Sequence, residues 1–187
     1  RAKSGEEIKR STSRSRRASR VDSVPDRVRP AQGSRPLVRC GVLGPLEVTG
    51  PDGTPSTPSG TLQRRLLACL VLRRGRVVSV DSIADVLWPD RLPNDHASAV
   101  HSHMFRLRRR VPDLPIEQHP PGYRLRGEQL QVDADEFEAT VARAMERRRD
   151  DPAEALHAFD EAVSTWRGDP YTDLAEVQEA RIEAERL

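Results

Sequence analysis

The stretch over residues 97–112, ASAVHSHMFRLRRRVP, constrains the fold most strongly, because its pattern suits a helix with two unlike faces. Its apolar residues recur at alternating steps of three and four, the spacing of one buried helix face: Ala97, Val100, Met104, Leu107 and Val111. The opposite side carries hydroxyls, an aromatic ring and guanidinium groups, namely Ser98, Ser102, Phe105, Arg106 and Arg109, with His101 and Arg108 beside them. The sequence therefore predicts a helix that packs by one stripe and exposes a polar, cationic face.

Two interpretations of this polar face compete when the helix is considered alone. Such a face fits the major groove of DNA, where arginine bonds guanine O6 and N7 in bidentate fashion and an apolar ring contacts a thymine methyl. A run of charges on a helix more often simply faces water, so the helix by itself favours a solvated face. The segments around it reverse that preference.

Two further helices precede this one in the chain. Residues 61–74 (TLQRRLLACLVLRR) indicate an amphipathic helix with Thr61 as its expected N-cap. Ser79 is the expected N-cap of a second helix, which ends before Pro89. A polar, proline-rich loop over residues 89–95 then leads to the helix described first.

Strand signals flank the helices on both sides. Residues 37–50 indicate two strands separated by a Gly-Pro turn, and residues 116–126 indicate a hairpin in which Gly122 suits either a positive φ or a close backbone approach. One more strand is expected near Leu130 and Val132. Strands, three helices and a terminal hairpin in this order describe an α+β winged helix-turn-helix, in which the third helix reads DNA and the hairpin is the wing.

The remaining residues follow a helical pattern. Two amphipathic helices are expected over residues 133–149 and 153–166, and a third from near Asp173 onward. Their inward positions are expected to be Phe137, Val141, Ala144, Met145, Leu156, Phe159, Val163 and Trp166. Two helices joined by a tight turn resemble a tetratricopeptide-type hairpin, so an all-α tetratricopeptide-like domain is expected. Because one hairpin and part of another cannot bury their faces alone, we expect this domain to be truncated or to depend on the winged helix or a partner.

Charge is unevenly distributed along the chain. Residues 1–36 hold 11 basic and 4 acidic residues, whereas residues 132–187 hold 7 and 16. A basic beginning and an acidic end suggest one surface for a polyanion and another for a different partner. Residues 1–36 have few large apolar side chains and are expected to be disordered. They are interpreted as a basic arm that attracts phosphates or, slightly favoured, as a solubilising tail or upstream sequence from a misplaced start.

Catalysis, metals and cofactors are not expected. The five histidines lack the three or four convergent ligands that a metal site needs. The chain has no P-loop, no GxGxxG after a strand and no GxSxG. Cys40 and Cys69 lie in apolar contexts typical of buried thiols in a reduced protein. No apolar run approaches the ~20 residues of a membrane span, so the protein is expected to be cytoplasmic.

Five motifs in the chain occur in the order of a known family. They are QRRLLACLVLRRGRVVSVDSIADVLWP (63–89), VHSHMFRLRRRVP (100–112), GYRL (122–125), VDADEF (132–137) and ALHAFDEAVSTWRGDPY (155–171). Over residues 37–187 the chain resembles the Streptomyces antibiotic regulatory protein family, in which an OmpR-type winged-helix DNA-binding domain precedes a bacterial transcriptional activation domain. The resemblance implies domains at 37–132 and 133–187, the second incomplete. It also implies an activator of biosynthetic or secondary-metabolism genes that binds direct repeats, self-associates on DNA and contacts RNA polymerase.

The winged-helix assignment and this resemblance together give the candidate site residues. The residues expected to read base edges are Ser98, His101, Ser102, Phe105, Arg106 and Arg109. Those expected to contact the DNA backbone are Arg64, Arg65, Arg108, Arg110, His119, Arg124 and Arg126. The resemblance alone implies a polymerase-contact loop at Asp90, Arg91, Leu92, Pro93 and Asn94. Many relatives carry arginine where this chain has His119, so we expect a weaker contact from the wing turn.

One rival function comes from a different class. The protein could be a helical protein–protein interaction adaptor whose winged helix no longer reads DNA and whose acidic half is the working surface. Salt dependence separates the two, because a DNA binder loses affinity steeply as salt rises. The cationic outer face of residues 98–109 argues for DNA.

Overall fold

The computed structural model describes residues 37–187, so the arm expected at residues 1–36 lies outside the described residues. The first sheet has the strand order β2-β1-β6, formed by β1 (Val38–Gly41), β2 (Glu47–Thr49) and β6 (Leu130–Val132). β1 pairs antiparallel with β2 and parallel with β6. The strand predicted near Leu130 therefore forms, and it joins the N-terminal sheet instead of lengthening the hairpin.

The second sheet forms the wing. Its order is β3-β5-β4, from β3 (Val77–Ser79), β4 (Ile116–His119) and β5 (Gly122–Leu125), and both pairings are antiparallel. A short 3-10 turn over Gly127–Gln129 leads from β5 to β6. A Cβ on Gly122 would lie 1.9 Å from the carbonyl oxygen of Val78, so only glycine allows β5 to approach β3 this closely. Of the two alternatives predicted for Gly122, the close backbone approach is confirmed.

Three helices complete the winged helix: α1 (Thr61–Leu72), α2 (Val80–Leu87) and α3 (His96–Arg110). Ser79 caps α2 by accepting a hydrogen bond from the Ser82 amide, and Asp95 caps α3 by accepting one from the Ser98 amide. The predicted cap at Thr61 is wrong. Thr61 is already the first helical residue, and Gly60 precedes it without a side-chain bond.

The core lies where the three helices meet the sheets. Val100, Met104 and Leu107 of α3 are at most 1% exposed, as the spacing of three and four predicts. They pack in one cluster with buried residues of α1, α2 and both sheets. Cys40 and Cys69 are buried in the same cluster, and burial raises the pKa of Cys40 to about 12 and that of Cys69 to about 11. Both thiols are therefore protonated core residues at neutral pH.

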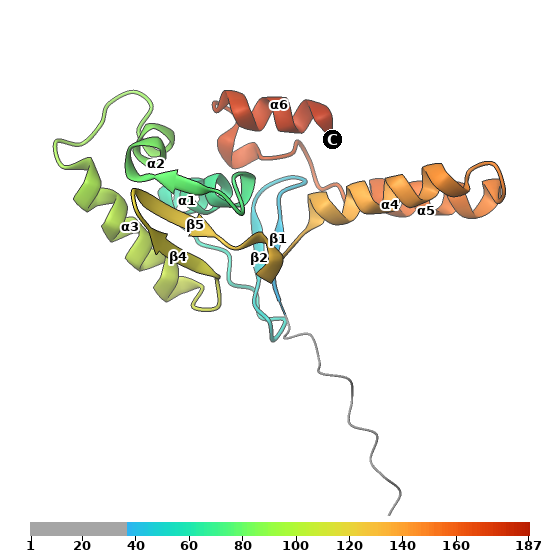
Figure 1. The fold of residues 1–187 in the computed structure, drawn as a ribbon, viewed down its shortest axis with the longest axis horizontal. Coiled ribbons are helices and arrows are strands. Elements are labelled where there is room, and N and C mark those ends of the chain that lie inside the picture. The colour runs from blue at the N-terminus through green and yellow to red at the C-terminus, as the bar shows by residue number, and fades with distance from the viewer. Residues whose placement is uncertain (1–36) are drawn as a thin grey trace, which may run out of the picture. The chain divides into compact units, whose positions relative to one another are not determined.

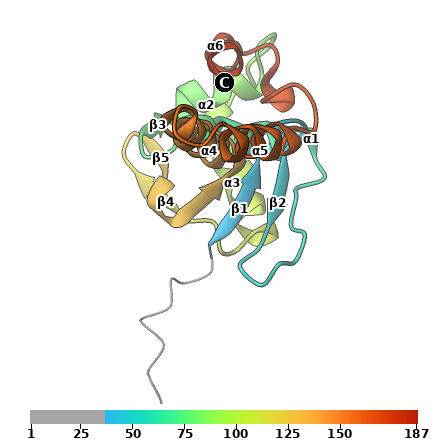
Figure 2. The ribbon, with the colours of Figure 1, turned by 90° about the vertical axis from the view of Figure 1, so that its right-hand side faces the viewer.

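Helices follow the winged helix directly (Figure 1). α4 (Asp133–Arg147) and α5 (Pro152–Ser164) lie side by side, seen nearly end-on in Figure 2. They are followed by a short 3-10 turn, η2 (Thr172–Leu174), and by α6 (Gln178–Arg186). The last helix begins at Gln178, so the start predicted near Asp173 is wrong. The turn η2 lies where the helix was predicted to begin, and Tyr171, directly before it, adopts a left-handed conformation with φ of 53°.

The apolar residues of α4 and α5 are only partly buried. Ala144, Ala155 and Ala162 are buried, and the rings of Phe137 and Trp166 meet at 5.3 Å between centroids. Three of the predicted inward residues are instead exposed: Met145, Leu156 and Val163. Periodicity identifies an apolar face, but within residues 37–187 no further element covers this one.

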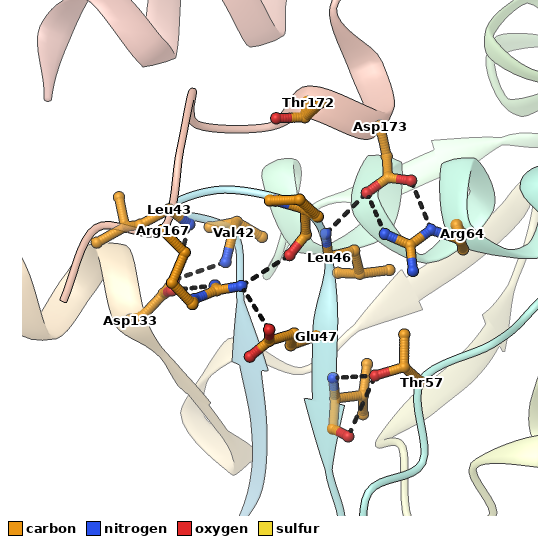
Figure 3. A network of polar contacts seen from close by, with 12 residues as sticks. Val42, Leu43, Leu46, Glu47, Thr57, Arg64, Asp133, Arg167, Thr172 and Asp173 are labelled. Carbon is orange, nitrogen blue, oxygen red and sulfur yellow. Dashed lines mark hydrogen bonds and ion pairs between the residues drawn. The ribbon is translucent and has the colours of Figure 1, made fainter.

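A polar junction joins the first sheet to the helical residues (Figure 3). The carboxylate of Asp133, at the start of α4, accepts hydrogen bonds from the Val42 and Leu43 amides at 2.7 and 3.2 Å. Arg167 donates to the same carboxylate at 2.9 Å and to the Pro45 carbonyl at 2.8 Å. The loop after β1 is thus held by residues 90 or more positions later in the chain.

Among the helices of the described residues, none is long and apolar enough to cross a lipid bilayer.

Candidate nucleic-acid interface

The outer face of α3 is polar and cationic over its whole length. The six residues predicted to read base edges are all exposed on this helix: Ser98, His101, Ser102, Phe105, Arg106 and Arg109. The helix contains no acidic residue, and its last turn holds three arginines. The buried stripe packs α3 against the core, and no other element among residues 37–187 covers the outer face of the helix (Figure 1).

A cluster around Tyr123 fastens the wing to α3. The hydroxyl of Tyr123 lies 2.6 Å from His101 Nδ1, and the guanidinium of Arg108 lies 5.5 Å from the centre of the Tyr123 ring. Arg108 also donates to the Ile116 carbonyl at 3.2 Å. Burial raises the pKa of Tyr123 against the opposing charge of Arg108, so the hydroxyl is protonated at neutral pH when it forms its hydrogen bond with His101. Sequence reasoning missed this role of Tyr123; the GYRL motif was the only available signal.

His103 belongs to the inner side of α3. Its ring meets that of Trp88 at 5.8 Å in an edge-on arrangement, and the side chain is half-buried. Burial, together with the nearby charge of Arg106, lowers the pKa of His103 below its ordinary value of 6.5. His103 is therefore neutral at pH 7 and helps to position Trp88 at the end of α2.

The wing carries cations that are partly neutralised by two carboxylates, Glu117 and Glu128, the second lying 3.2 Å from Arg126. Glu117 accepts hydrogen bonds from Arg124, the shorter at 2.6 Å, and lies 3.2 Å from Arg126. The hydrogen bond from Arg124 lowers the pKa of Glu117, so this carboxylate is charged at neutral pH. His119 is exposed at the end of β4. The wing arginines must exchange Glu117 for a phosphate if they are to contact DNA.

Arg64 and Arg65 of α1 lie away from this surface. Arg64 makes two hydrogen bonds to Asp173 at 2.7 and 2.9 Å (Figure 3). Arg65 pairs with Glu176 at 3.0 Å and donates to the Val86 carbonyl. Their guanidinium groups are engaged by acidic residues of the helical part, so the predicted contacts of these two residues with the DNA backbone would require them to leave those partners. Their acidic partners are more than 100 residues away in sequence and could not be identified from spacing.

The loop between α2 and α3 is exposed next to the candidate interface. Asp90, Arg91, Leu92 and Asn94 are exposed, whereas Pro93 is half-buried. Leu92 is 45% exposed. Across residues 37–187 no group of three or more metal-ligating side chains converges.

Two family models match the chain. "Transcriptional regulatory protein, C terminal" matches residues 57–125, and "Bacterial transcriptional activator domain" matches residues 132–187. The winged-helix fold and these matches place the chain in the class of transcriptional regulators in which a winged-helix domain precedes a bacterial transcriptional activator domain. The chain belongs to the Streptomyces antibiotic regulatory protein family, as its five motifs predict.

Relatives of the chain are transcriptional regulators and not enzymes. EmbR of Mycobacterium tuberculosis is 36% identical over 149 residues, covering 74% of this chain and 37% of EmbR. AfsR of Streptomyces coelicolor is 32% identical over 108 residues, which cover 56% of this chain and 11% of AfsR. RedD of the same species is 24% identical over 152 residues, covering 77% of this chain and 43% of RedD. The chain therefore spans well under half the length of these relatives.

A solved structure of Mycobacterium tuberculosis EmbR in complex with a low-affinity phosphopeptide has a similar fold. The TM-score is 0.64 at 33% sequence identity, over 80% of this chain and 41% of the EmbR chain. The winged-helix α+β part of the predicted fold is consistent with this neighbour.

Proposed function

We propose that this chain is a sequence-specific DNA-binding regulator that activates biosynthetic genes in the bacterial cytoplasm. The outer face of α3 carries the proposal, because six candidate base-reading residues are exposed on a helix without acidic side chains. Residues 37–132 would form the DNA-binding domain, and residues 133–187 the start of a tetratricopeptide-like activation domain. Residues 1–36 would add a basic arm.

The proposed contacts divide by chemistry. Arg106 and Arg109 face base edges, supported by Ser98, His101, Ser102 and Phe105. Arg110, His119, Arg124 and Arg126 contact phosphates, which fixes register without reading sequence. Arg108 acts indirectly, because its guanidinium group is tied to Tyr123 and the Ile116 carbonyl.

Further partners are proposed from the family. Tandem copies of the chain would bind direct repeats near promoters and associate with one another there. The exposed α2–α3 loop, with Leu92 at its centre, would contact RNA polymerase. Exposure of a large apolar side chain beside charged Asp90 and Arg91 supports a protein contact at this place.

Arg106→Ala and Arg109→Ala are each expected to weaken binding by about 1–3 kcal/mol, with the loss confined to one base position. The preferred duplex is first selected from random sequences, and affinities are then measured by fluorescence anisotropy on that duplex and on its single-base variants. Arg149→Ala is the matched control, because Arg149 is exposed in the turn between α4 and α5. An equal loss on the selected duplex and on scrambled DNA would contradict base reading by that arginine.

Salt dependence tests the DNA-binding proposal as a whole. Four phosphate contacts predict that affinity falls roughly 100-fold between about 50 mM and about 200 mM salt. A helical adaptor is the second candidate, favoured by the exposed apolar residues Met145, Leu156 and Val163 on α4 and α5. A chain that captures proteins through this face and shows no salt-dependent duplex binding would support the adaptor.

A further inference from the structure

Phe105 occupies an unusual position on the outer face of α3. It is 62% exposed, and within residues 37–187 no other aromatic side chain is as exposed. Its neighbours on the helix face are polar or cationic. A phenyl ring exposed to water gains no burial in the free protein, so covering it with an apolar group of a ligand would contribute to binding.

Arg109 lies one helical turn after Phe105, and its guanidinium group lies over the Phe105 ring in a cation–π contact. The centre of the Arg109 guanidinium is 5.8 Å from the centre of the Phe105 ring. Among the described residues, Arg109 has no carboxylate partner within ion-pair distance. A cation–π contact uses none of the N–H groups as hydrogen-bond donors to a protein acceptor, so the guanidinium of Arg109 can still bind a planar acceptor. The pair therefore presents an apolar surface and a two-pronged donor side by side.

We propose that Phe105 and Arg109 act as one recognition unit that reads a thymine methyl together with a nearby guanine. This inference rests on the proposed DNA-binding function and specifies the bases involved. In the major groove thymine presents a C5-methyl group, and guanine presents the two acceptors O6 and N7 that suit arginine.

The spacing of the pair limits where the two bases lie. Residues four apart on a helix are separated by about 6 Å along its axis, and base pairs rise about 3.4 Å along a strand. The thymine and the guanine are therefore expected within one or two base steps of each other. The same unit would accept 5-methylcytosine in place of thymine, because it carries the same methyl group.

The surroundings favour DNA over a protein as the occupant of this surface. Arg109 lies over the ring, His101 and Arg106 are exposed on the same helix, and α3 has no carboxylate that would balance them. An apolar protein partner would leave these polar groups desolvated without compensation. A duplex offers a methyl group for the ring and anionic or acceptor groups for its neighbours.

The test uses the full chain and the duplex selected for the arginine variants. Each thymine is replaced in turn by deoxyuridine, which removes the methyl group and leaves base pairing unchanged. We expect one position at which the wild type loses about 3- to 5-fold in affinity, the value for one buried methyl group. At that position the affinity of Phe105→Ala for DNA should fall less than about 1.5-fold when thymine is replaced by deoxyuridine. Arg109→Ala should no longer prefer guanine over other bases at a position within two base steps.

A second variant and an unfolding measurement distinguish loss of the methyl contact from loss of the fold. Phe105→Leu retains an apolar side chain and should keep part of the sensitivity to deoxyuridine, while thermal unfolding checks that Phe105→Ala remains folded. Sequence-specific binding that is unaffected by deoxyuridine at every thymine would overturn this inference and leave the proposed function intact. A Phe105→Ala chain that loses only cooperative binding to a second repeat would overturn it too, because the ring would then contact another copy. Absence of any preferred duplex would overturn the proposed function and this inference with it.

Discussion

Gly122→Ala is expected to lower the free energy of unfolding by about 3 kcal/mol. The added Cβ would lie 1.9 Å from the Val78 carbonyl oxygen and 2.8 Å from the Ser79 Cα. Both atoms belong to the backbone of β3, so they cannot move aside without breaking the pairing of β3 with β5. Urea unfolding should show a lower midpoint at an unchanged slope, which identifies a change in stability alone.

Gly127→Ala is the matched control for this substitution. A Cβ there would meet only the side chain of Arg74 at 3.5 Å or more, an ordinary contact. We expect its urea midpoint to correspond to a change within about 0.5 kcal/mol. If both variants unfolded at the same urea concentration, the close approach of β5 to β3 would be refuted.

Local features of the winged helix were predictable from the sequence. The buried stripe of α3 and the cap at Ser79 depend on residues near one another in the chain, the range at which helix periodicity and capping chemistry act. Their positions therefore follow from the sequence even before the tertiary structure is considered. At Gly122 the sequence indicated only that a glycine was required, and the strand it approaches, β3, is identified by the tertiary structure.

The sequence did not show which arginines are exposed and which form ion pairs within the protein. Arg64 and Arg106 look alike in sequence, as members of cationic helices. Arg64 is paired with Asp173, 109 positions later, whereas Arg106 remains exposed on α3. Local patterns identify which face of a helix is polar, but the partner of that face depends on tertiary packing.

For α5, the sequence identified an apolar face but not whether that face is buried. Spacing identified Leu156 and Val163 as members of an apolar face, and they lie on the same side of α5, seven residues apart. The structure leaves both more than 60% exposed. Whether an apolar face is buried depends on the presence of a second surface, which amphipathic spacing does not specify. The prediction that one hairpin cannot cover its own faces agrees with this exposure.

Asp173→Ala is expected to destabilise the described unit by about 3 kcal/mol, because it removes one partner of a largely buried charge pair. Asp173 accepts two hydrogen bonds from Arg64 and one from the Leu46 amide at 2.8 Å (Figure 3). Only 23% of the Arg64 side chain and 13% of the Asp173 side chain are exposed. The substitution would leave a buried guanidinium and a backbone amide without their acceptor. Urea unfolding measures the loss, and Asp160→Ala on the exposed side of α5 is the matched control.

The same carboxylate predicts how stability depends on pH. Burial by itself raises the pKa of Asp173, but hydrogen bonds from Arg64 and Leu46 outweigh it and hold the pKa below its ordinary value of 3.8. A carboxylate with a lowered pKa in the folded state contributes stability above its unfolded pKa, and that contribution is lost as pH falls through the folded value. The wild type should therefore lose stability more steeply than Asp173→Ala below about pH 4. Parallel stability curves for the two chains in this range would mean that Asp173 does not join the helical residues to α1. A double-mutant cycle with Arg64→Ala would then give no coupling between the two side chains.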